Sequence, residues 1–279
     1  MSMWKECEGL QEELVKIRRE LHQIPEFGFD LPETQKYVTD KLDELGIPYK
    51  CSGTDSSIIA EIKGGQPGKT VALRADMDAL KITEANDVDY KSKHEGLMHA
   101  CGHDNHIAML LGAAKVLNAH KAEIKGNVRL LFQTAEELSK GAEIMIKDGA
   151  MDGVDAVFGQ HIGSIINKDI PAGKVIVTPG CCMASFDRFV IHVKGTGCHG
   201  STPEKGTDPI TMASHIVINL QEIIAREVSA VKAAVVKIGY FHGGVAYNAI
   251  PSEVEIEGTI RALEEPIRQY LAKRIEEIA

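Results

Sequence analysis

Residues 70–78, TVALRADMD, form a short apolar run that ends in two carboxylates. An apolar run of this length, bounded by turn residues, is typical of a buried strand. We therefore predict a strand over residues 70–75. Asp76 and Asp78 follow it, so acidic side chains are expected where the strand ends.

Neighbouring segments show the same alternation of short strands and helices. Strands are predicted at residues 57–62, 127–133 and 156–160, and helices at 10–22, 30–46, 103–117 and 142–147. Regular alternation of this kind is typical of an α/β domain with a mostly parallel sheet. Residues 64–70, GGQPGKT, resemble a phosphate-binding loop, but the first glycine is one residue too close and a strand follows. We interpret this loop as a hairpin turn.

The pattern changes near residue 185. Strands are predicted at residues 186–194, 233–241 and 253–260, and helices at 208–227 and 266–279. The order β-α-β-β-α is most of a ferredoxin-like α+β module and lacks only its final strand. We therefore predict two domains, residues 1–184 and residues 185–279.

Composition excludes several classes of protein. The 279 residues are 44% apolar and 25% charged, as in ordinary globular chains. A net charge of −9 without a basic stripe argues against nucleic-acid binding. The N-terminus has no signal-peptide core, and the longest apolar run, residues 108–117, is broken by Lys115, so we expect a cytoplasmic protein without a membrane partner.

The six cysteines have no framework spacing, so reduced thiols are expected. Adjacent Cys181 and Cys182 lack the geometry of a redox pair, and we interpret them as small, buried apolar residues.

Residues 99–106, HACGHDNH, concentrate metal-binding and reactive side chains. Histidine and cysteine are the usual ligands of zinc-like ions, and carboxylates also suit harder dications. Glu136-Glu137 follows one predicted strand and His161 another. Because the carboxyl ends of strands in an open α/β sheet form a common crevice, these segments are expected to converge on one metal site. The alternative is a set of solvated polar loops.

The pair Glu136-Glu137 is informative in itself. Beside a dication, one carboxylate can bind the ion while the other takes a proton from water and passes it to a leaving group.

Six ordered motifs resemble the M20 metallopeptidase family, in its amidohydrolase branch of aminoacylase, hippurate hydrolase and N-acyl-amino-acid deacylase type. The motifs are RRELHQIPE (18–26), LRADMDAL (73–80), MHACGHDNH (98–106), FQTAEE (132–137), HGSTP (199–203) and NAIP (248–251). The resemblance implies an α/β catalytic domain with two divalent metal ions and a smaller lid domain through which the protein forms a homodimer. It also implies hydrolysis of the amide bond of an N-acyl amino acid or a similar small conjugate. The ions are zinc, manganese or cobalt, alternatives that the ligand types leave open.

The resemblance also assigns roles to individual residues. The implied metal ligands are Cys101, His103, Glu137 and His161. Glu136 resembles the general base that activates water and then protonates the leaving amine, and Asp78 the residue that orients a ligand.

Three further positions belong to the lid. His199 resembles the residue that reaches a partner subunit's site and stabilises the oxyanion. Asn248 and Arg261 resemble positions that hold the substrate carboxylate.

The chain departs from the family at three places. Lys81 and Thr134 stand where the branch usually has proline. Family members also continue beyond the position of Ala279, completing the lid's last strand and returning to the catalytic domain with a final histidine ligand. Both domains are therefore expected to be incomplete, with one metal ion or none bound. This leaves a second hypothesis, a catalytically silent fragment that dimerises and binds metal weakly.

Overall fold

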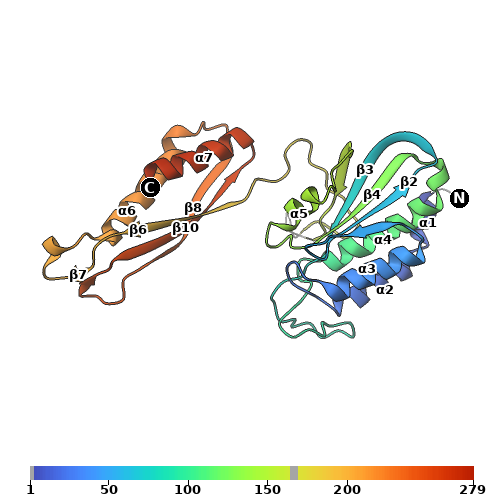
Figure 1. The fold of residues 1–279 in the computed structure, drawn as a ribbon, viewed down its shortest axis with the longest axis horizontal. Coiled ribbons are helices and arrows are strands. Elements are labelled where there is room, and N and C mark those ends of the chain that lie inside the picture. The colour runs from blue at the N-terminus through green and yellow to red at the C-terminus, as the bar shows by residue number, and fades with distance from the viewer. Residues whose placement is uncertain (1–2, 164–168) are drawn as a thin grey trace. The chain divides into compact units, whose positions relative to one another are not determined.

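The computed structural model describes residues 3–163 and 169–279, which form two compact units, Met1–Pro171 and Ala172–Ala279 (Figure 1). Residues 172–184 contain neither helix nor strand. Cys181 and Cys182 in this segment are exposed, so the prediction that they are buried is wrong. The boundary predicted at residue 185 falls inside the second unit, just before its first strand, β6 (Asp187–Lys194).

The first unit is built on a five-stranded sheet of order β1-β2-β4-β3-β5. Its strands are β1 (Tyr49–Cys51), β2 (Ile58–Lys63), β3 (Gln66–Asp76), β4 (Lys125–Gln133) and β5 (Ala156–Gly159). β3 runs parallel to β4 and β5, whereas β2 is antiparallel to β1 and β4. The α/β class with a mostly parallel sheet is confirmed, because β1, β3, β4 and β5 all run in the same direction. The sheet is mixed only because β2 runs in the opposite direction. The short loop between β1 and β2 explains part of this, because parallel strands need a longer crossover.

The prediction of a hairpin at residues 64–70 is wrong. β2 and β3 are not neighbours, because β4 lies between them and pairs with both. The connecting chain crosses the start of β4 in backbone contact, with the Gly64 N–H donating to the Gly126 carbonyl at 3.0 Å. A Cβ at Gly64 would lie 2.1 Å from that carbonyl oxygen, so this crossing requires glycine.

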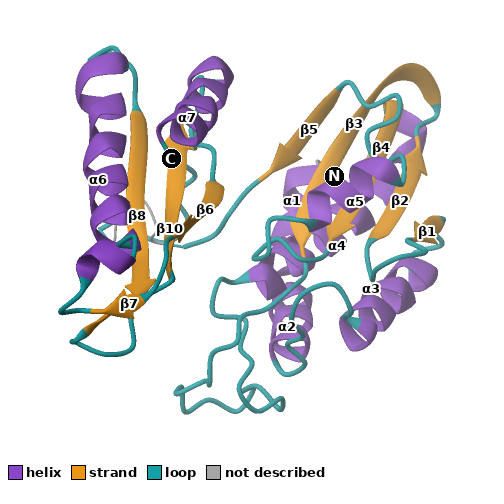
Figure 2. Cartoon of the chain, turned by 60° about the vertical axis from the view of Figure 1, so that its left-hand side comes forward, coloured by secondary structure: helices purple, strands orange, loops and turns teal. Residues whose placement is uncertain are grey.

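Helices cover both faces of this sheet (Figures 1 and 2). α2 (Gln11–His22), α3 (Pro32–Glu44) and α4 (His103–Ala119) pack on one face, and α1 (Met3–Glu8) contacts α4. The main core lies between these helices and the sheet and includes Leu21, Val38, Leu42, Ile58, Ile107, Leu111, Leu130 and Phe132. α5 (Gly141–Lys147) packs on the other face through Met145, against Ala72 and Leu131. Helices are thus present at all four predicted places in this unit.

The second unit has the predicted β-α-β-β-α order. Its elements are β6, α6 (Pro209–Glu222) with a π-helical extension (Ile223–Glu227), β8 (Ala234–Gly243), β10 (Glu253–Ala262) and α7 (Glu265–Ile278). The sheet order is β6-β10-β8, with β10 antiparallel to both neighbours. Every second residue of β10 is buried against α6 and α7, which explains its alternating pattern.

A two-stranded ribbon completes this unit, formed by β7 (Cys198–His199) and β9 (Ala249–Ile250). Among the residues that the structure describes, no helix is long and apolar enough to cross a membrane.

Candidate metal centre

Asp78 lies just beyond β3 and fixes the position of the glutamate pair. Its side chain is buried, and its two carboxylate oxygens accept the backbone N–H groups of Glu136 at 3.0 Å and Glu137 at 3.1 Å. The end of β3 thereby holds the loop that follows β4.

His103, the first residue of α4, is oriented by the same segment. Its Nδ1 lies 2.7 Å from the backbone carbonyl of Asp78, and because a carbonyl only accepts, Nδ1 carries the proton. Nε2 is therefore an acceptor in the neutral ring. It is fully buried and has no hydrogen-bond partner among the described residues.

A second buried acceptor faces this nitrogen. Oε1 of Glu137 lies 3.8 Å from Nε2 of His103 and also has no partner, and a carboxylate oxygen of Asp76 lies 3.6 Å from the same nitrogen. An unpaired buried acceptor costs about 1–3 kcal/mol, so two facing each other need a compensating group. A divalent cation between them would satisfy both, and the residues present therefore fit a metal ion.

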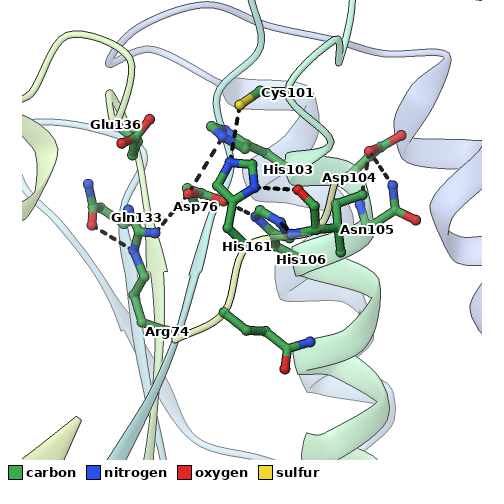
Figure 3. Close-up of polar contacts among 12 residues, drawn as sticks. Arg74, Asp76, Cys101, His103, Asp104, Asn105, His106, Gln133, Glu136 and His161 are labelled. Carbon is green, nitrogen blue, oxygen red and sulfur yellow. Dashed lines mark hydrogen bonds and ion pairs between the residues drawn. The ribbon is translucent and has the colours of Figure 1, made fainter. Parts of the chain in front are cut away.

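Cys101 and His161 complete the cluster (Figure 3). The Cys101 Sγ lies 3.2 Å from the His161 Nε2, and the His161 Nδ1 donates to the Ile162 carbonyl at 2.5 Å, which directs Nε2 toward the sulfur. Atoms of Cys101, His103 and His161 that could bind a metal all lie within 4.8 Å of one another. The same holds for the corresponding atoms of His103, Glu136 and Glu137. The structure thus brings together all four predicted ligands and the predicted base, with His103 common to both groups.

Burial and charge shift the pKa values in this cluster. Burial, reinforced by the negative charge of Glu137 and Asp76, raises the pKa of Glu136. Burial and the carboxylates of Glu137 and Glu136 raise the pKa of the Cys101 thiol to about 12. Burial opposes charge on His103, but hydrogen bonding to Asp78 and the charges of Asp76 and Asp78 outweigh it and raise the pKa of that ring. The cluster is therefore a strongly negative environment that favours a cation.

Asp76 and His106 also belong to this cluster, and neither was predicted as a site residue from the sequence. Asp76 is buried, and its carboxylate accepts from His106 Nδ1 at 2.5 Å and from Arg74 Nη1 at 2.7 Å. Burial alone would raise the pKa of Asp76, but these two partners lower it below its usual value. His106 lies three residues after His103, a spacing that places two helical side chains on the same face and could have indicated it.

The predicted lid residues all lie in the second unit, in two places. The His199 Nδ1 accepts the Ser201 N–H at 3.2 Å, which leaves Nε2 to carry the proton of the neutral ring. Asn248 lies beside it, since its carbonyl accepts the Gly200 N–H at 2.8 Å. Asn248 precedes the start of β10, whereas Arg261 is the second-to-last residue of that strand. The Arg261 guanidinium lies 4.3 Å from the Phe186 ring centroid. His199 and Asn248 are thus brought together, and Arg261 is not near them within this unit.

Comparison with known proteins places this arrangement in a family. The model of Peptidase family M20/M25/M40 matches residues 72–278, and the chain belongs to that family. The chain is 43% identical to N-acetyl-L-cysteine deacetylase of Bacillus subtilis, over 95% of its own length and 63% of that protein. It is 42% identical to N-acyl-L-amino acid amidohydrolase of Geobacillus stearothermophilus, over 95% of its length and 71% of the relative.

A solved structure supports the same family assignment. The YXEP protein of Bacillus subtilis, described as a dinuclear metal binding peptidase from the M20 family, matches with a TM-score of 0.81 and 37% identity. The match covers 97% of this chain and 69% of that one. The chain therefore spans about two thirds of the length of the relatives that it matches.

Proposed function

We propose that this protein is a metal-dependent amidohydrolase that cleaves the amide bond of N-acyl amino acids or related small conjugates. The observation that carries the proposal is the pair of unpartnered buried acceptors, His103 Nε2 and Glu137 Oε1, beside Cys101 and His161. The relatives named as an N-acetyl-L-cysteine deacetylase and an N-acyl-L-amino acid amidohydrolase support the substrate class.

The proposed metal ligands are Cys101, His103, Glu137 and His161. Sulfur and imidazole ligands favour zinc-like ions, and the carboxylate also accepts manganese or cobalt. The description of YXEP as dinuclear supports two bound ions. When bound, such ions polarise a carbonyl oxygen and lower the pKa of water.

Glu136 is proposed as the proton carrier. Its raised pKa suits a group that takes a proton from the attacking water and delivers it to the departing nitrogen. Asp78 supports this role because its carboxylate holds the Glu136 and Glu137 N–H groups in place. In this scheme Glu137 binds the metal while Glu136 remains free to exchange a proton.

The second unit is proposed to act as the lid and dimerisation domain. His199, with Nε2 carrying a proton, is suited to donate to the oxyanion of the tetrahedral intermediate. Asn248 and Arg261 are proposed to bind the substrate carboxylate. Arg261 lies eight residues along β10 from Glu253, roughly 26 Å at 3.3 Å per residue. His199 and Asn248 lie at the β7–β9 ribbon, beyond the Glu253 end of β10. Arg261 therefore cannot reach the same small substrate as His199 and Asn248 of its own subunit. A homodimer would allow His199 and Asn248 of one subunit to meet Arg261 of the other.

Metal analysis combined with a hydrolysis assay tests the proposal. The chain is stripped with a chelator, reloaded with zinc, manganese or cobalt, and supplied with N-acetyl-L-cysteine or another N-acetyl amino acid. Bound metal with metal-dependent release of amine is the expected result. A chain with neither metal nor turnover would instead match the hypothesis of a catalytically silent dimerising module.

A further inference from the structure

His106 lies beneath the metal centre with both ring nitrogens in use (Figure 3). Its ring is buried in α4, and Nδ1 lies 2.5 Å from a carboxylate oxygen of Asp76. Because the ionised carboxylate only accepts, Nδ1 carries the proton and Nε2 is an acceptor. Nε2 accepts the backbone N–H of Ile162 at 3.0 Å. This ring is therefore committed to holding two protein groups and offers no free lone pair to a metal ion.

The residue that His106 holds follows His161 directly. The His161 side chain is exposed, and it follows the edge strand β5, whose four residues are all exposed. The orientation of its ring depends on Ile162, because Nδ1 of His161 donates to the Ile162 carbonyl. The His106 and His161 rings also meet edge to face, with their centroids 4.8 Å apart.

Ile162 is fixed from a second side by the turn between two proposed ligands. A Cβ at Gly102 would lie 2.6 Å from Cδ1 of Ile162, and Gly102 has a φ of +93°, which favours glycine. The Ile162 side chain thus packs into the space that this glycine leaves open. The preceding residue, Gln160, is also tied to α4, through a contact of 3.0 Å from its Nε2 to Sδ of Met109.

From these contacts we infer that His106 is a positioning residue for His161. Asp76 sets the tautomer of His106, the Nε2 atom of His106 holds the Ile162 N–H, and the Ile162 carbonyl orients the His161 ring toward Cys101. This inference rests on the proposed function, because the orientation of His161 matters through its role as a metal ligand. Partners that orient a ligand are worth about 10- to 100-fold in metal affinity.

A matched pair of substitutions separates this role from a general effect on folding. His106→Asn places an amide near the position of Nδ1 and keeps a donor to Asp76, but it is too short to reach Ile162. His106→Gln is long enough to reach Ile162. We expect His106→Asn to weaken Co²⁺ binding by about 10-fold or more and to change the visible spectrum of the bound ion, and His106→Gln to recover most of both.

The same substitution in a His161→Ala background completes the test. If His106 acts through His161, His106→Asn should change Co²⁺ affinity by no more than about twofold once His161 is absent. Leu110→Ala, which removes a buried side chain of the same helix, is the folding control and should lower thermal stability while leaving Co²⁺ affinity unchanged.

Two results would overturn the inference while the proposed function stands. One is wild-type affinity and spectrum in His106→Asn. The other is an equal loss with and without His161. A wild-type chain that binds no Co²⁺ and hydrolyses no N-acetyl amino acid would instead overturn the proposed function, and this inference with it.

Discussion

Nε2 of His103 lies 3.8 Å from Oε1 of Glu137, and neither buried atom has a hydrogen-bond partner among the described residues. His103 begins α4 and Glu137 lies in the loop after β4, so the fold brings together two acceptors that are 34 positions apart in the sequence. With the His103 ring neutral, these two facing acceptors have no favourable interaction with each other. A cation between them explains the arrangement, and the predictions below follow from this pair and its surroundings.

Glu136→Gln should keep the metal and lose turnover. Glutamine preserves the shape of the side chain but cannot take up a proton, so hydrolysis should fall by about 10²- to 10⁴-fold. Metal content is measured beside the rate of amine release from an N-acetyl amino acid. Glu143→Gln, at an exposed acidic position of α5, is the matched control and should leave both unchanged. Normal turnover in Glu136→Gln would refute the proposed proton carrier.

Asp78→Ala should reduce both stability and metal affinity. It leaves the backbone N–H groups of Glu136 and Glu137 without their acceptors, at a cost of about 1–3 kcal/mol for each group that stays buried and unpaired. Release of this loop should also weaken metal binding by about 10- to 100-fold. Denaturant unfolding and a Zn²⁺ competition titration measure the two effects. Unchanged metal affinity would show that Asp78 does not position the glutamate pair.

Stability should fall as the pH rises through the pKa of His22. The ring lies 2.6 Å from Asp104 and 3.1 Å from Glu84, and the hydrogen bond to Asp104 is the largest cause that raises the pKa of His22 above 6.5. A raised pKa in the folded state means that the protonated form stabilises the fold. This contribution is complete below pH 6.5 and is lost as the pH rises past the folded value.

The His22 contribution can be isolated by substitution. The difference in free energy of unfolding between wild type and His22→Gln should be larger at pH 5.5 than at pH 9. A difference that grows with pH would mean that His22 is buried as the neutral ring.

Most strands and helices of both units could be predicted from local patterns, because each short apolar run or helical face is read from neighbouring residues. The short elements α1 and β1 were not predicted. The neighbours of each strand could not be predicted in this way. β4 lies between β2 and β3 through pairing with both strands, and the backbone of Gly64 contacts that of Gly126 where the chain crosses it. These are contacts between residues far apart in the sequence. The two-residue strands β7 and β9 are too short to carry a recognisable pattern.

The residues of the candidate site also fall into those that a local pattern could predict and those that it could not. Residues in dense motifs, such as Cys101 and His103, could be predicted because several ligand types stand close together. His106 lies in the same motif, but its role follows from contacts with Asp76 and Ile162, 30 and 56 positions away. No local pattern contains that information.

The most direct test is a crystal structure of the zinc-loaded protein, with anomalous scattering recorded on both sides of the zinc edge. The account predicts a zinc ion bound by Sγ of Cys101 at about 2.3 Å, and by Nε2 of His103 and of His161 at about 2.0–2.1 Å, with a Glu137 oxygen completing the set. Zinc bound elsewhere, or a structure in which Nε2 of His103 and Oε1 of Glu137 face each other with no ion between them, would contradict it.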